Sequence, residues 1–475
     1  MRSAPNTIPM KIFNRYYSAA DMLLVLGDIV IAILITGAVR GLMYLTDFSD
    51  AFSMTVWMNQ GEQIAAFVVV SFYYTDLYDL DQTPLKSEWT LRLFTGFGIA
   101  CLLIGGLSYL IPRFGLQDIY LFQMILLGLG LFSWRVGFIR MVEKAKAPAK
   151  VLIVGTRKIA RLVAEEICRQ KHLGIQVVGF IGRQNGEITL SYGNPVLVSL
   201  PVRPPQATFE VIEREGVNRI LIEDQESCAD FPAQELVTLR LKGFPIEDCH
   251  TFYERLTSKI AISDLHPGWI VLSQGFRRSR WNLLIKRVID ILVSALGLIF
   301  TSPITLLTAV AIKIDSPGPV FYRKERVGYS ERPFILYKFR SMVSEAEALS
   351  GPVWAQANDS RVTRVGKLIR KLRIDELPQM INVLKGEMSF VGPRPERPIF
   401  VSRLKEKVPY YHLRFSVKPG ITGWAQILAP YGDSEEGAIE KLQYELYYLK
   451  NISPILDLQI IFETLKVVIL GKGAQ

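Results

Sequence analysis

The sequence has few residues of the types that bind transition metals or form disulfides. Its 475 residues include only four cysteines and four histidines. Cys101, Cys168, Cys228 and Cys249 form no CxxC pair and no cluster with histidine. This spacing argues against a zinc site and predicts reduced, structural thiols in a protein that faces the cytosol.

Charge is also limited: 21% of residues are charged, whereas 49% are hydrophobic. This composition predicts a membrane protein with sizeable soluble parts, and the length leaves room for about three domains. The net charge of +10 suits anionic lipid headgroups or a phosphorylated substrate. Because no nucleic-acid-binding motif accompanies the charge, we do not expect nucleic acid as a partner.

Four apolar segments in residues 1–147 predict a transmembrane four-helix bundle. They are Met22–Val39, Ile64–Tyr74, Phe94–Ile111 and Ile119–Trp134. A span needs about 20 residues, so the second segment is long enough only if flanking residues such as Ala51–Gly61 contribute. The first apolar run starts late and has no small-residue cleavage site after it, so no cleavable signal peptide is expected.

Basic residues predict the orientation of this bundle. They precede the first segment, Arg40 alone lies in the loop after it, and a group follows the fourth segment: Arg135, Arg140, Lys144, Lys146 and Lys150. The positive-inside rule then places both ends in the cytoplasm. Asp28 is costly in lipid, so we expect it to face other helices, although the segments offer no evident charged partner.

Residues 148–257 have the pattern of a Rossmann-like α/β domain with a regulatory or structural role. A strand at Val151–Val154 ends in Gly155, a helix follows at Ile159–Gln170, and further strands are expected at Val177–Ile181 and Arg219–Glu223. This alternation predicts βαβ units on a parallel sheet. The Pro-rich stretch 195–205 is expected to be a loop, and residues 258–281 a linker.

The turn after the first strand departs from the dinucleotide-binding fingerprint. Arg157 stands where that fingerprint needs a glycine, so that the backbone can approach a pyrophosphate. A domain without a cofactor is therefore favoured. Arg157 and Lys158 could still hold an anion at the helix N-terminus, which leaves a regulatory nucleotide open.

A second kind of membrane segment is predicted at residues 286–313. Val288–Ile312 is an apolar run of 25 residues with basic residues on both flanks, and Ser302-Pro303 interrupts it. With both flanks basic, neither end favours export. We expect a re-entrant helix that proline breaks, with the Ser302 hydroxyl bonded to a carbonyl freed at the break. The alternative is an ordinary fifth span with a proline kink.

Candidate chemistry is concentrated after residue 313. Asp375 can attack a phosphoryl group, and Glu376 beside it can hold Mg²⁺. The alternative is that Asp375 only caps a helix. The proline-stiffened loop 385–397 carries two arginines, and Arg326 and Lys338 add further basic groups. Such groups suit phosphate recognition, although solvated turn arginines are equally possible from this loop alone.

Six motifs occur in one order: Lys286–Asp290, Ser302-Pro303, Tyr337–Met342, Asp375–Gln379, Val391–Pro395 and Lys418–Gln426. Together they resemble the bacterial sugar transferase family, the monotopic polyprenyl-phosphate phosphoglycosyl transferases, over residues 281–471. The preceding bundle and Rossmann-like domain resemble the long form of that family. The resemblance implies a mainly helical catalytic domain at residues 282–475 of an enzyme in the bacterial cytoplasmic membrane, with this domain facing the cytoplasm.

The resemblance also implies a two-step, Mg²⁺-dependent reaction. Asp375 attacks the sugar-bearing phosphate of a UDP-sugar and releases UMP, and undecaprenyl phosphate then takes the phosphosugar. Glu376 binds Mg²⁺ or assists deprotonation. The implied phosphate- or nucleotide-binding residues are Arg326, Lys338, Arg373, Arg394, Arg414 and Glu445, and His412 occupies a matching position near the site. Membrane lipids and a second copy of the chain are the implied partners.

Two other functions remain to be weighed. A membrane-anchored nucleotide-sugar dehydratase would need an intact glycine fingerprint near Gly155, and Arg157 counts against it. A non-catalytic scaffold of a polysaccharide-export complex would not need Asp375. We also hypothesise that Lys286, Arg287 and Lys313 draw the lipid phosphate toward Asp375. No motif separates glucose from galactose as the donor sugar.

Overall fold

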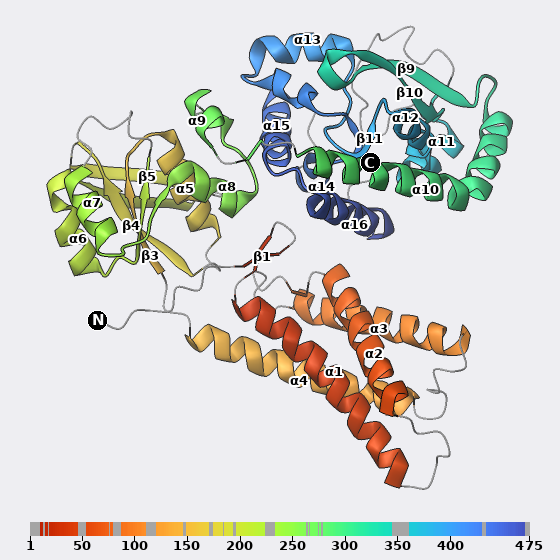
Figure 1. The fold of residues 1–475 in the computed structure, drawn as a ribbon, viewed down its shortest axis with the longest axis horizontal. Coiled ribbons are helices and arrows are strands. Elements are labelled where there is room, and N and C mark those ends of the chain that lie inside the picture. Colours follow the sequence, from red (N-terminus) through yellow and green to blue (C-terminus); the bar gives the residue numbers. More distant parts are fainter. Residues whose placement is uncertain are drawn as a thin grey trace. The chain divides into compact units, whose positions relative to one another are not determined.

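The computed structural model of the protein describes most of the chain. The described residues are 10–12, 15–17, 19–45, 54–75, 77–78, 87–110, 120–145, 149–170, 174–183, 185–192, 196–223, 233–262, 265, 267–273, 275–276, 279–343, 361–429 and 434–470. Contacts divide the chain into two compact units, Met1–Glu247 and Asp248–Gln475. Figure 1 shows the helices and strands of both.

The N-terminal region contains the four expected helices. They are α1 (Ala19–Leu45), α2 (Met54–Tyr74), α3 (Ser87–Leu110) and α4 (Tyr120–Ala145), preceded by the short antiparallel strands β1 (Met10–Ile12) and β2 (Arg15–Tyr17). Three helices contain segments long and apolar enough to cross a membrane: Met22–Val39, Trp89–Gly106 and Leu121–Met141. Helix α2 is not among them, because its first half carries Asn59, Gln60, Glu62 and Gln63. The protein is therefore a membrane protein with three candidate spans here.

A buried ion pair joins α1 to α4. Both carboxylate oxygens of Asp28 accept from Arg135, at 3.2 and 2.5 Å, and neither side chain is exposed. Arg135 also donates to the Leu77 carbonyl at 2.9 Å and lies over the rings of Phe72 and Tyr78. The expectation that Asp28 faces other helices is confirmed. Two details of the prediction were wrong. Asp28 was expected to have no charged partner but has one, and Arg135 was expected after the fourth helix but lies inside α4.

The middle region is built on a six-stranded sheet in the order β5-β6-β4-β3-β7-β8. Its elements are β3 (Ala149–Val154), α5 (Lys158–Arg169), β4 (Ile175–Ile181), β5 (Gly186–Tyr192), β6 (Val196–Arg203), η3 (Pro205–Ala207), α6 (Thr208–Glu215), β7 (Arg219–Ile222), α7 (Ala233–Leu241) and β8 (Ile246–Asp248). The prediction of an α/β domain is confirmed, but the sheet is mixed. β5 runs antiparallel to β6, and β6 occupies most of the stretch expected to be a loop.

The strands β3 and β7 are neighbours, and the strands that follow each of them are added on opposite sides. This switch point is where a Rossmann-like fold would place a ligand. Here a protein carboxylate occupies the turn. Glu223 Oε2 accepts from the backbone amide of Arg157 at 3.1 Å, at the N-terminus of α5. Gly155 is required beside it, because its φ is +124° and a Cβ would overlap the Glu223 side chain. An internal anion thus takes the position expected for a bound one.

The C-terminal unit is mainly helical, as expected. Its elements are α8 (Cys249–Thr257), α9 (Pro267–Leu272), α10 (Arg280–Asp315), β9 (Phe321–Val327), η6 (Tyr329–Glu331), β10 (Pro333–Phe339), α11 (Arg364–Lys371), η7 (Ile374–Glu376), α12 (Gln379–Lys385), β11 (Ser389–Val391), α13 (Pro398–Lys407), η8 (Tyr411–Ser416), β12 (Gly420–Thr422), α14 (Trp424–Leu428), α15 (Glu435–Lys450) and α16 (Pro454–Leu470). Its largest core joins α13, η8, α14, α15 and α16.

The segment 258–281, expected to be a linker, belongs partly to this core. Ile260, Ile262 and Leu265 are buried in it. Helix α8, which the sequence assigned to the α/β domain, also lies in the C-terminal unit. There Glu254 accepts from Lys450 at 2.5 Å and from Asn451 at 3.0 Å, both at the end of α15. The apolar residues of this segment lack a helical period, so their burial could not be predicted from the sequence.

Helix α10 contains Pro303 and bends part of the way along its length (Figure 1). Proline cannot donate to the carbonyl four residues before it, which is that of Ile299. The Ser302 hydroxyl donates to this carbonyl at 2.8 Å, the hydrogen bond expected at the break. The Thr305 hydroxyl donates to the Ser302 carbonyl at 2.9 Å. The bend is therefore stabilised locally, and a return to the same membrane side stays a prediction.

Buried polar contacts attach the first half of α10 to the rest of the unit. Asp290 accepts from the Ser389 hydroxyl at 2.9 Å and from the Phe390 amide at 2.8 Å. Lys286 donates to Asp457 and to the Val391 carbonyl, each at 2.9 Å. These contacts fix β11 and the loop after it against α10.

The short parallel strands β11 and β12 bring two loops into backbone contact. Gly392 donates to the Thr422 carbonyl at 2.8 Å, and Gly420 donates to the Pro393 carbonyl at 2.8 Å. A Cβ on Gly392 would overlap the Lys418 carbonyl oxygen and lie 2.9 Å from the Gly420 nitrogen. Only glycine allows this crossing.

The substitution Gly392→Ala should lower the free energy of unfolding of the C-terminal unit by about 1–3 kcal/mol, because the two backbones must separate. Thermal unfolding of the detergent-solubilised protein measures the change. Gly268→Ala is the control, since nothing lies within 4 Å of a Cβ there. Equal unfolding temperatures for both variants would contradict the crossing.

Replacing Ser302-Pro303 with Ala-Ala should straighten α10 and carry the chain after it across the membrane. A single cysteine placed at Gln475, in a protein whose four native cysteines are serine, would then react with an impermeant label from outside the cell. Ser302→Ala alone keeps Pro303 and should leave the label excluded. A double variant whose tail stays protected would count against the proline break as the cause of re-entry.

Candidate active site

The two adjacent carboxylates lie in a 3₁₀ turn between two helices. Helix α11 ends at Lys371, Arg373 adopts a left-handed conformation with φ 56°, and η7 carries Asp375 and Glu376. Pro378, not Asp375, is the N-cap residue of α12. Both acidic side chains are buried, with only 9% of each residue exposed. Helix capping therefore does not account for Asp375, and a strained non-glycine residue beside it is typical of functional sites.

Glu376 is the point on which the basic groups converge. Its Oε1 atom accepts from Lys338 Nζ at 2.9 Å and from Arg394 Nη2 at 3.0 Å, and Arg373 Nη1 lies 3.9 Å away. Lys338 comes from β10, and Arg394 comes from the loop after β11. Burial by itself would raise the pKa of Glu376, but these charges hold it well below its usual range.

Asp375 has the opposite shift. Burial raises its pKa, the Lys338 charge opposes this, and the neighbouring Glu376 carboxylate raises it further. Arg370 and Arg394 also lower it, but the net direction is upward. Two adjacent carboxyl groups with pKa values pushed apart are suited to different roles. Glu376 stays anionic and organises cations, and Asp375 is a buried carboxylate beside positive charge, as an attack on a phosphoryl group requires.

The loop that carries Arg394 is held by main-chain contacts on both sides of that residue. The preceding Pro393 carbonyl accepts from Gly420, and the Glu396 carbonyl accepts from the Val327 amide at 3.0 Å. The Arg394 carbonyl accepts from Arg414 Nη2 at 2.9 Å. The proline-stiffened loop is therefore a rigid support for a guanidinium group rather than a solvated turn.

Arg326 presents a further cationic group from β9. Its Nε and Nη1 atoms are buried and have no hydrogen-bond partner among the described residues. Burial lowers its pKa, and the nearby Glu396 charge opposes this. A buried guanidinium with unused donors can take an anion, since unmet donors are costly inside a protein.

The structure brings together some of the predicted residues and separates others. Lys338, Arg373 and Arg394 meet at Glu376. Arg414 and Glu445 instead form a buried pair at 2.7 Å, with 5% of each side chain exposed. Their predicted binding of phosphate or nucleotide stays a prediction, but their described contacts are with protein atoms.

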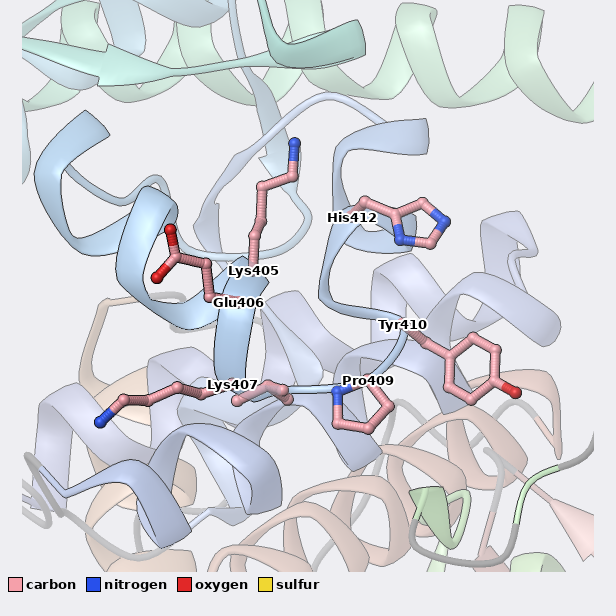
Figure 2. A pocket seen from close by; sticks show the side chains of 7 residues that line it. Lys405, Glu406, Lys407, Pro409, Tyr410 and His412 are labelled. Carbon is pink, nitrogen blue, oxygen red and sulfur yellow. The ribbon is translucent and has the colours of Figure 1, made fainter.

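His412 is exposed and lies on a separate hollow of about 190 Å³. The other lining residues are Lys405, Glu406, Lys407, Val408, Pro409 and Tyr410. Figure 2 shows their side chains at the end of α13, and neither Asp375 nor Glu376 lines this hollow. Lys405 binds Glu331 at 2.8 Å, and Lys407 binds Glu435. Both lysines of the hollow therefore already have ionic partners, and the hollow is separate from the acidic pair.

The hypothesis that basic residues at the start of α10 draw in the lipid phosphate is not supported for two of them. Lys286 is held by Asp457 and the Val391 carbonyl. Arg287 donates to the Val383 and Leu384 carbonyls at the end of α12, at 2.7 and 3.0 Å. Both residues thus attach α10 to the unit.

Sequence reasoning missed Arg370 as a site residue. Its Nε atom donates to the Ser341 hydroxyl at 2.8 Å, and its charge lowers the pKa of Asp375. The residue lies before the left-handed turn at Arg373, so no helical spacing relates it to Asp375. Only its place in the basic cluster beside the acidic pair hinted at a role.

The donor set was tested for Mg²⁺. Within the described ranges, no group of three or more His, Cys, Asp or Glu side chains is placed to hold a metal ion. Mg²⁺ commonly uses only one or two carboxylates together with substrate phosphates and water. Asp375 and Glu376 fit that pattern, and the contacts described for Glu376 involve Oε1. The residues are therefore compatible with Mg²⁺ arriving with a phosphorylated substrate.

The chain is similar to known proteins over the region that contains this site. A family model described as "Bacterial sugar transferase" matches residues 281–471. The chain is 43% identical over 240 residues to the UDP-N-acetylgalactosamine-undecaprenyl-phosphate N-acetylgalactosaminephosphotransferase of Aeromonas hydrophila. This alignment covers 50% of this chain and 56% of the relative. It is 39% identical over 340 residues to the undecaprenyl-phosphate glucose phosphotransferase of Komagataeibacter xylinus, covering 68% of this chain and 60% of the relative.

These alignments span only somewhat more than half the length of the two relatives. A shorter protein is covered almost completely: the exopolysaccharide production protein PSS of Rhizobium leguminosarum bv. phaseoli is 40% identical over 188 residues, or 38% of this chain and 94% of the relative. Residues 281–471, which match the family model, contain all of α10 except its first residue, both carboxylates and each basic residue around them. The chain belongs to the bacterial sugar transferase family.

Proposed function

We propose that the protein transfers a hexose 1-phosphate from a UDP-sugar to undecaprenyl phosphate and releases UMP. The observation that carries the proposal is the pair Asp375-Glu376, whose pKa values are shifted in opposite directions within a cluster of cations. The name of the Aeromonas hydrophila relative supports a UDP-sugar donor, and the names of both long relatives support undecaprenyl phosphate as the acceptor. The site is on the cytoplasmic side of the bacterial inner membrane, where the soluble donor is found.

In the first step, a carboxylate oxygen of Asp375 attacks the sugar-bearing phosphorus of the donor. The bond from that phosphorus to the bridging oxygen breaks, and UMP leaves with the bond electrons. Asp375 then holds the phosphosugar as an acyl phosphate. Lys338 and Arg394 stand beside Glu376 and neutralise charge on the phosphates, with Arg326 as a further donor.

In the second step, a phosphate oxygen of undecaprenyl phosphate attacks the same phosphorus. The bond between phosphorus and Asp375 breaks, so the carboxylate is regenerated and the product is undecaprenyl-diphospho-sugar. Splitting one displacement into two lets each substrate use the same carboxylate in turn.

Mg²⁺ belongs to this proposal as the ion that would neutralise the donor's diphosphate when bound. Asp375 and Glu376 would hold it together with phosphate oxygens. The chain's own basic residues keep Glu376 ionised, so that it can serve as a ligand or assist the lipid phosphate.

A membrane-inserted α10 would bring the lipid acceptor to this site. Exposed apolar side chains occur along it, with Phe300 76% and Leu307 71% exposed on either side of Pro303. Exposed apolar residues also occur on α16, including Ile455. A large apolar surface of this kind marks a membrane or protein interface. We propose that α10 enters the membrane from the cytoplasmic face and returns to it.

We also propose that the chain acts as a homodimer. The product would prime the synthesis of exopolysaccharide, capsule or O-antigen.

The first test is UMP release by detergent-solubilised protein with undecaprenyl phosphate, Mg²⁺ and a panel of UDP-sugars. Glucose, galactose and N-acetylgalactosamine donors belong in the panel. Asp375→Asn keeps the side-chain shape but removes the nucleophile, so the rate should fall by at least about 10³-fold. Glu331→Gln, a surface carboxylate-to-amide change, is the matched control and should keep wild-type activity.

UMP release from one donor that is lost in Asp375→Asn would establish the reaction and name the sugar. Equal release by Asp375→Asn and wild type would remove Asp375 as the nucleophile. No UMP release with any of the donors would favour a non-catalytic scaffold.

The pH dependence of the reaction should report Asp375. The nucleophile must be ionised, and its pKa is raised above the usual 3.8, so kcat/KM should fall as pH drops through that raised value. Arg370→Gln removes a charge that lowers this pKa, so the acidic limb should move to higher pH by up to about 1 unit.

Arg364→Gln, on the same helix, is the control and should leave the limb in place. The limb is measured from kcat/KM between pH 4 and pH 8, values chosen to bracket roughly the shifted aspartate. An acidic limb that Arg370→Gln leaves unmoved, or moves to lower pH, would contradict the assignment to Asp375.

A further inference from the structure

A buried ion pair contacts the main chain of Arg394. Arg414, from η8, gives its Nη2 atom both to Glu445 Oε1 at 2.7 Å and to the Arg394 carbonyl at 2.9 Å. Its Nη1 atom donates to the Tyr411 hydroxyl at 2.5 Å. Burial raises the pKa of Tyr411 to about 12, so this hydroxyl stays neutral.

This arrangement orients one guanidinium by means of another. Glu445 holds the Nη2 end of Arg414, and that end then fixes the main chain of residue 394. The side chain of the same residue reaches Glu376 at 3.0 Å. Arg414 and Glu445 each expose only 5% of their side chain, so neither is placed like a group that meets a substrate from solution.

We infer that Arg414 and Glu445 are positioning residues that set the direction of the Arg394 side chain toward the acidic pair. This inference rests on the proposed function for its kinetic consequence, but the geometry itself is independent of the reaction. It replaces direct phosphate or nucleotide binding as the role of the two residues.

The position of a charge-neutralising group matters because a misplacement of about 1 Å can cost about 100-fold in rate. Losing the Glu445 carboxylate leaves Arg414 without its ionic partner in a buried place. Arg414 can then shift, and the Arg394 carbonyl loses a fixed donor. Glu445 lies on α15, whose end also binds Glu254 of α8, so the pair is attached to a firmly held helix.

A double-mutant cycle separates positioning from a general structural role. Glu445→Gln should lower kcat for UMP release by about 10- to 100-fold in the wild-type background. In an Arg394→Ala background, the same change should alter kcat by less than about 2-fold, because the residue it positions is gone. Equal fold-losses in both backgrounds would overturn the inference.

Amide hydrogen exchange of residues 392–397 gives a readout that does not depend on activity. Glu445→Gln should make these amides exchange faster, while the core amides of α15 keep their protection. Glu440→Gln is the matched control, because Glu440 lies on the same helix and pairs with Lys259 instead, at 2.6 Å. Glu440→Gln should change neither the amide exchange rates of residues 392–397 nor kcat in either background of the cycle.

Arg414→Lys provides a second variant if Glu445→Gln fails to fold, since it retains the charge but not the forked contact. It should show the same loss of additivity with Arg394→Ala and the same faster exchange. If the wild type releases no UMP, the proposed function fails while the exchange experiment still decides the positioning. Unchanged exchange in both variants would contradict it.

Discussion

The structure of the catalytic region depends on one carboxylate oxygen, Oε1 of Glu376. Lys338 of β10 and Arg394 of the loop after β11 both donate to it. Burial of an unpaired carboxylate is unfavourable, so Glu376 and the two cations stabilise one another only when all three segments are correctly placed. The same charges act on Asp375 next to it. Assembly of the site and part of the shift in the pKa of Asp375 thus follow from the same group of charges.

Those segments are themselves fixed by α10 and by backbone crossings. Asp290 and Lys286 attach α10 to β11 and the residues around it. Arg340 donates to the carbonyls of Ser316 and Pro317 at 2.7 and 2.6 Å, just after α10 ends. Both ends of the bent helix are therefore tied to elements that carry site residues. A helix placed in a bilayer and attached in this way would hold the acidic pair at a fixed depth beside the lipid headgroups.

The sequence could predict what is local. Each of the features that it predicted is encoded by residues that are neighbours in the chain. These features are the Asp375-Glu376 pair, the basic motifs around Lys338 and Arg394, and the Ser302-Pro303 break. Pairs distant in sequence were beyond it: Asp28 with Arg135, and Arg414 with Glu445, meet only through tertiary packing. The strands β5 and β6 were missed because prolines in β6 are typical of loops, whereas here the pairing partner on either side stabilises an extended chain.

In the middle domain, a side chain of the protein lies where this kind of fold commonly binds an anion. At the end of β7, Glu223 places its carboxylate against the α5 N-terminus, and Gly155 leaves room for that side chain rather than for a pyrophosphate. A bound anion would have to displace a carboxylate that is 2% exposed and bonded to the Arg157 amide. Arg157 breaks the glycine fingerprint, and Glu223 fills the anion position. Two independent parts of the chain therefore argue against a dinucleotide at this turn. The cations described around Glu376, which are Lys338, Arg373 and Arg394, come from the C-terminal unit itself.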